Sequence, residues 1–129
     1  MLTIYPACLW LDEGTYVIKV PDVKGCITTA ETIEEAFDDI RDALAGCLCA
    51  LEDARIPLPQ SSSPSAIQES GKTVILVDVD LVKYRKETDT RAVRKNVSMP
   101  AWLFNMADER GLNCSQVLQD ALKRELKLV

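Results

Sequence analysis

The chain has 129 residues, of which 47% are hydrophobic and 27% charged, which is enough for one ordinary domain and a small second one. It has no histidine, which excludes Ser-His and Cys-His nucleophilic catalysis, and its five cysteines include no C-x-x-C pair, which disfavours a disulfide framework. Residues 1–80 hold 5 Lys and Arg against 14 Asp and Glu, a net charge of −9, whereas residues 81–129 hold 10 against 6, a net +4.

This division of charge predicts that the two parts of the chain bind different partners. An acidic surface is repelled by nucleic acid and attracts a basic protein, and a basic segment attracts nucleic acid. Acidic residues on solvated faces also keep a domain soluble, and this alternative stays open for residues 1–80.

Several features bear on location and on cofactors. No apolar run approaches the roughly 20 residues of a membrane helix, and the start of the chain, MLTIYPACLWLDEG, lacks the basic leading segment of a secretory signal. Together with the unpaired thiols, these features predict a cytoplasmic protein. Cys47 and Cys49 lie two apart in a predicted helix and point away from each other, so we expect no metal site and no cofactor.

Three short strands are predicted near the start, at Leu2 to Trp10, Thr15 to Val20 and Cys26 to Ala30. The first is apolar on both alternating sets of positions, and Pro6 within it favours an edge strand or a bulge. Asp12-Glu13-Gly14 forms the turn of a hairpin between the first two strands.

The longest predicted helix follows these strands. Thr32 and Glu35 form a capping box at its start. Its apolar residues recur every three or four positions, which predicts one stripe packed on the sheet: Ile33, Ala36, Phe37, Ile40, Ala43, Leu44, Cys47, Leu48 and Leu51. Acidic residues occupy the other side, namely Glu34, Glu35, Asp38, Asp39 and Asp42.

Residues 56–72 hold three of the six prolines, and we predict an ordered excursion within the first domain rather than a linker between domains. Thr73 to Leu81 then restores a strand, with Ile75, Val77, Val79 and Leu81 on one face. The first domain, residues 1–83, is therefore α+β with the order β-β-β-α-β. Residues 84–91 are predicted to be the linker to a second domain at 92–129, because Arg85 to Arg91 is charged and has no apolar anchor.

Three carboxylates of the first domain raise the question of catalysis. Asp78 and Asp80 share a face of the predicted strand, and with Asp22 they supply the clustered carboxylates that hold magnesium ions in a nuclease. A solvated strand face and an ordinary Asp turn account for the same residues, so we predict no catalytic residues.

Arg91 to Leu126 is predicted to form a strand and two helices. Val97 and Met99 alternate with the polar residues Arg94, Asn96 and Ser98, as in a half-buried strand. Pro100 ends the strand and opens a helix at about Ala101 to Arg110, which Gly111 stops in a left-handed conformation. Asn113 caps the second helix, whose apolar stripe is Val117, Leu118, Ala121, Leu122 and Leu126.

A unit of this size has too little interior to stand alone, so we predict that two chains build it. If the two strands pair, the ribbon carries Arg94, Asn96 and Ser98 twice on its open face, and such a ribbon fits the DNA major groove. The motifs N-V-S-M-P and G-L-N-C-S-Q in residues 92–126 resemble the ribbon-helix-helix family of DNA-binding domains. The resemblance implies that these three residues read bases and that Asn113, Cys114 and Ser115 anchor a phosphate at a helix N-terminus. Many members carry Arg at the position of Cys114.

A second resemblance covers the first domain. The motif YVIKVPDVKGCITTAETIEEA, from Tyr16 to Ala36, with the later VDVDLVKY, is similar to the HicB antitoxins of type II toxin-antitoxin systems. It implies a truncated ribonuclease-H-like fold at 1–83 that covers the active site of a small basic mRNA-cleaving toxin of the HicA type, through residues that the resemblance does not identify. It also implies a bacterial homodimer, or a tetramer, that represses its own operon.

Two alternatives remain open. One is a stand-alone ribbon-helix-helix repressor whose first domain senses a small molecule, although no motif supplies polar groups for a ligand. The other is a magnesium-dependent nuclease of ribonuclease-H type acting through Asp78 and Asp80.

Overall fold

The computed structural model describes residues 2–67 and 70–128, and contacts between Cα atoms divide the chain into two compact units. The first unit comprises residues 1–91, and the second comprises residues 92–129.

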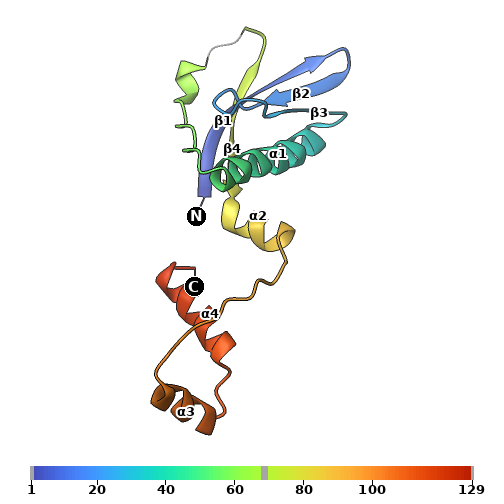
Figure 1. Ribbon diagram of the computed structural model, residues 1–129. Helices are drawn as coiled ribbons and strands as arrows, with labels where there is room; N and C mark the ends of the chain where they lie inside the picture. Colours follow the sequence, from blue (N-terminus) through green and yellow to red (C-terminus); the bar gives the residue numbers. More distant parts are fainter. Residues whose placement is uncertain (1, 68–69, 129) are drawn as a thin grey trace. The chain divides into compact units, whose positions relative to one another are not determined.

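The first unit is built on a four-stranded antiparallel sheet (Figure 1). The strands are β1 (Leu2–Asp12), β2 (Thr15–Lys19), β3 (Ile27–Ala30) and β4 (Thr73–Asp80), in the spatial order β3-β2-β1-β4. Glu13 and Gly14 connect β1 to β2, and both have positive φ, at 50° and 81°, as a two-residue hairpin turn requires. The predicted α+β class and the β-β-β-α-β order are confirmed.

The long helix α1 (Ile33–Asp53) covers one face of this sheet (Figure 1). The backbone N–H of Glu35 donates to Thr32 Oγ1 at 3.1 Å, so Thr32 caps the helix as predicted. The predicted stripe packs into the core from Ala36 onward, with Ile40, Leu44 and Leu48 fully buried. Ile33 and Phe37 are the exceptions: Ile33 lies in the first turn and remains 48% exposed, and Phe37 is half-buried outside the core, with the guanidinium of Arg41 5.0 Å from its ring centre.

The segment between α1 and β4 lies against the first unit, as predicted for an ordered excursion. Tyr5 Oη donates to the backbone oxygen of Pro59. The Asp22 carboxylate accepts from the backbone N–H of Ser62 at 2.8 Å and from its hydroxyl at 2.5 Å. A 3-10 turn, η1 (Pro64–Ala66), follows these contacts.

The structure corrects the prediction for the start of the linker, because α2 (Leu81–Thr88) is a helix that belongs to the first unit. Asp80 ends β4 and also caps α2, since its carboxylate accepts from the backbone N–H of Lys83 at 3.1 Å. Tyr84, predicted as the first residue of the linker, packs against the core of the first unit instead.

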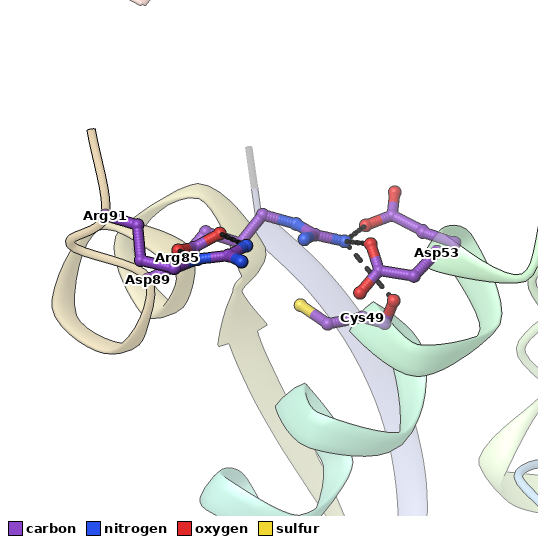
Figure 2. A network of polar contacts seen from close by, with 6 residues as sticks. Cys49, Asp53, Arg85, Asp89 and Arg91 are labelled. Atoms are coloured by element: carbon purple, nitrogen blue, oxygen red, sulfur yellow. Dashed lines mark hydrogen bonds and ion pairs between the residues drawn. The ribbon is translucent and has the colours of Figure 1, made fainter. Parts of the chain in front are cut away.

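Arg85 fastens α2 to the end of α1 (Figure 2). Its guanidinium donates to the backbone oxygen of Cys49 at 3.3 Å and pairs with Glu52 and Asp53, each at 3.1 Å. The hydrogen bond to Glu52 raises the pKa of Arg85 above its usual value. A cation at a helix C-terminus also complements the helix dipole, so this contact stabilises the junction of α1 with α2.

The second unit holds α3 (Ala101–Glu109) and α4 (Cys114–Glu125). Both helices confirm the predicted positions, with Gly111 at a φ of 67° between them. The strand predicted around Arg94 to Met99 is absent from the single chain, where these residues have neither helix nor strand structure. A strand is defined by hydrogen bonds to a neighbour, and the partner predicted for this one is a second chain.

Candidate functional site

An apolar groove runs through the second unit. It is lined mainly by Val97, Met99, Leu103, Phe104, Leu112, Val117 and Leu118. Each of these side chains is at least 38% exposed in the single chain, and none of the described residues of this unit is buried. Soluble proteins rarely expose so continuous an apolar surface, and an exposed patch of this kind is typical of an interaction site.

The polar residues predicted to read bases lie on the segment that borders this groove. Arg94, Asn96 and Ser98 are all exposed, and Ser98 also borders the groove beside Val97 and Met99. The segment thus presents apolar side chains to the groove while Arg94 and Asn96 remain accessible to a ligand.

The residues predicted to bind a phosphate lie at the start of α4. The side chain of Asn113 accepts from the backbone N–H of Gln116 at 3.2 Å, which confirms it as the N-cap. Cys114 and Ser115 occupy the first turn and are exposed. Their N–H groups belong to the set that has no partner within a helix, and the positive end of the helix dipole lies there. This geometry suits an anion.

The three carboxylates considered for nuclease chemistry have separate structural partners. Asp22 holds Ser62, Asp78 pairs with Arg41 at 2.5 Å, and Asp80 caps α2. The hydrogen bond from the Lys83 backbone lowers the pKa of Asp80. Within the described part of the chain, no three His, Cys, Asp or Glu side chains gather so that they could hold a metal ion.

The cysteines are mostly packing residues. Cys8, Cys26 and Cys49 are buried and Cys47 is half-buried, and these four form no disulfide. Burial, helped by the neighbouring Cys47 thiol, raises the pKa of Cys26 to about 12, so this thiol stays protonated at neutral pH.

The face of the sheet opposite α1 was not predicted to carry functional residues. Leu2, Ile4 and Leu76 lie there at 62%, 48% and 54% exposed, next to an acidic hollow formed by β4, α1 and α2. The hint in the sequence is that β1 is apolar on both alternating sets of positions, as in a strand that is covered on both faces.

Among residues 2–67 and 70–128, no helix is both long and apolar enough to cross a membrane.

The fold matches solved antitoxin structures. A chain of a toxin-antitoxin complex from Streptococcus pneumoniae superposes with a TM-score of 0.62 and 26% identity, over 97% of this chain and 99% of that chain. The antitoxin HicB of Burkholderia pseudomallei superposes with a TM-score of 0.55 and 25% identity, over 93% of this chain and 96% of that chain. The fold therefore defines the chain as one of the antitoxin class.

The sequence identifies the family within that class. Residues 5–119 match the family model described as the HicB-like antitoxin of bacterial toxin-antitoxin systems, and the chain belongs to this family. It is also 28% identical over 110 residues to a 14.9 kDa protein from the rep-hol intergenic region of Haemophilus phage HP1, across 82% of this chain and 80% of that protein. The predicted resemblance to HicB antitoxins is confirmed at the level of the family.

Proposed function

We propose that this chain neutralises a small, basic, mRNA-cleaving toxin of the HicA type and represses the operon that encodes both proteins. The observation that carries the proposal is the family match over residues 5–119. The Streptococcus pneumoniae structure that matches nearly the whole chain is itself a toxin-antitoxin complex, which supports a toxin as the partner.

Toxin binding is assigned to the first unit, residues 1–91, which is proposed to be a truncated ribonuclease-H-like domain that ends with α2. A protein that binds RNA carries positive charge, and residues 1–80 carry a net −9. Complementary charge speeds encounter and fixes orientation. The role is binding rather than catalysis, since Asp22, Asp78 and Asp80 each have a structural partner. Such a pair would act in the bacterial cytoplasm.

DNA binding is assigned to residues 92–129 as a ribbon-helix-helix dimer. A second copy would fill the apolar groove and pair its segment around Arg94 to Met99 as the missing strand. Arg94, Asn96 and Ser98 would then face the major groove, and the first turn of α4, at Asn113, Cys114 and Ser115, would hold a phosphate.

Co-expression tests the antitoxin function. The HicA-type protein encoded next to this chain is expected to arrest growth when induced alone, and the full-length chain is expected to restore growth and to co-purify with it. Continued arrest in cells that contain the folded chain would rule out neutralisation.

Arg94→Ala is expected to weaken binding to DNA from the chain's own promoter by about 1–3 kcal/mol and to relax specificity at one base pair, if the guanidinium reads a guanine. Gel-shift titration against the promoter and its single-base variants measures both effects. Arg91→Ala is the control, because Arg91 pairs with Asp89 and is 81% exposed before the predicted strand. Equal losses for the two variants would mean that Arg94 contributes only charge.

A further inference from the structure

In the first unit α1 covers one face of the sheet, and the other face is exposed only in part, because Pro6 and Cys8 are buried on it while other side chains are not. α1 packs on the face that carries Tyr5, Ala7, Val77 and Val79. Because side chains alternate along a strand, the residues between these positions point to the opposite face. Leu2, Ile4 and Leu76 belong to that second set, and each is about half exposed or more, at 62%, 48% and 54%.

These three side chains form one continuous apolar patch beside the edge strand β4. Ile4 pairs with Asp78 and Pro6 with Leu76, so Leu76 lies diagonally next to Ile4. Leu2 pairs with Asp80 one step further along the same two strands. Pro6, which lies opposite Leu76 and next to Ile4 on this face, is fully buried.

An acidic hollow adjoins this patch where β4, α1 and α2 meet. Its charged lining comprises Asp38, Asp42, Asp78, Asp80 and Glu87 together with Arg41 and Lys83, and Leu2 belongs to both the hollow and the patch. Arg41 is already engaged with Asp78 at 2.5 Å. Five acids against two bases leave the hollow negative, so an apolar contact and an attraction for cations lie side by side.

We propose that this composite surface, the Leu2-Ile4-Leu76 patch with the adjoining acidic hollow, is where the first unit binds its toxin. The inference rests on the proposed function and adds the location. The occupant is a small basic protein that presents an apolar side chain to the patch and Lys or Arg to the hollow. An apolar centre with a charged rim is the usual build of a specific interface.

The charge of the first unit argues against a second copy of this chain as the occupant. Each copy would bring a domain with a net −9 over residues 1–80, and like charges across an interface oppose binding. A basic partner would instead bring positive charge to the acidic hollow while an apolar side chain contacts the patch.

The first test is titration calorimetry of the purified full-length chain with the HicA-type protein encoded beside it. Leu76→Lys is expected to weaken binding by about 30-fold or more, because it places a cation in the centre of an interface with a basic protein. Ile27→Lys is the matched control. Ile27 is on the same face and is 53% exposed, but it lies on β3, at the opposite edge of the sheet.

A second pair of variants on the surface of α1 tests the hollow separately. Asp42→Lys is expected to weaken binding by about tenfold at low salt, with the loss shrinking as salt is raised. Asp39→Lys makes the same change of charge on the same helix but lies outside the hollow, and is expected to change affinity by less than about threefold.

The outcomes separate the location from the function. If the wild-type chain does not bind the toxin, the proposed function itself fails. If the wild-type chain binds the toxin and both Leu76→Lys and Asp42→Lys bind it as tightly as the wild type, the function stands and the proposed surface is wrong. The proposed surface is also wrong if the controls Ile27→Lys and Asp39→Lys lose as much affinity as these two variants. If Leu76→Lys fails to fold, as judged by its circular dichroism, the Asp42 and Asp39 pair decides.

Discussion

Leu118→Ala is expected to destabilise the proposed dimer of residues 92–129 by about 2–5 kcal/mol, the cost of deleting a leucine from a packed core. Leu118 is 38% exposed in the single chain and lines the apolar groove, so a second copy filling the groove would bury it. Because the two chains of the proposed dimer must pair before they bind DNA, the affinity for every DNA sequence should fall by the same factor. Arg94→Ala is instead expected to cause a loss that depends on one base pair. Sedimentation equilibrium and gel-shift titration measure the two effects.

Leu128→Ala is the matched control for this prediction. Leu128 is also 38% exposed, but it lies beyond the end of α4 and is not among the residues that line the groove. Its truncation should cost less than about 0.5 kcal/mol, as is usual for surface substitutions. A dimer of Leu118→Ala as stable as the wild type would show that the groove is not the dimer interface.

Leu44→Ala is expected to cost the first unit about 2–5 kcal/mol of its free energy of unfolding, because it opens a cavity between α1 and the sheet. Leu44 is fully buried at the centre of the core. At temperatures where the variant is partly unfolded, toxin binding should fall while DNA binding through residues 92–129 persists. Urea unfolding followed by circular dichroism, with both binding assays on the same sample, measures this.

Ile33→Ala supplies the comparison on the same helix. Ile33 is 48% exposed in the first turn of α1, and its truncation should cost less than about 1 kcal/mol. If the two substitutions destabilised the unit equally, the first turn of α1 would be packed more closely than its exposure indicates.

Local patterns were sufficient to predict most of the first unit. The alternation in β2 and β4, the three-and-four spacing of α1 and the Thr32 cap each reflect physics within a few residues of chain, and each is confirmed. The same holds for Gly111 and Asn113 around the start of α4.

Features that depend on distant contacts were not predicted. The charged residues after β4 gave no apolar stripe, yet α2 forms because Asp80 caps it and Arg85 reaches the end of α1. The strand expected around Arg94 to Met99 needs a partner that one chain does not contain. The assignment of Arg94, Asn96 and Ser98 to base reading stays a prediction. The assignment of Asn113, Cys114 and Ser115 to phosphate binding stays a prediction as well.

Because β4 leads directly into α2, related chains are expected to tolerate insertions and deletions at some positions and not at others. Asp80 is both the last residue of the strand and the cap of the helix, so no loop absorbs an insertion there. One added residue would turn α2 by about 100°, which would carry Tyr84 off the core and Arg85 away from α1. Insertions and deletions at this joint are therefore disruptive, whereas the excursion of residues 56–72 can change length outside the contacts made by Leu58, Pro59 and Ser62. Related chains should therefore keep a constant spacing between Val79 and Arg85 and differ most in length between α1 and β4.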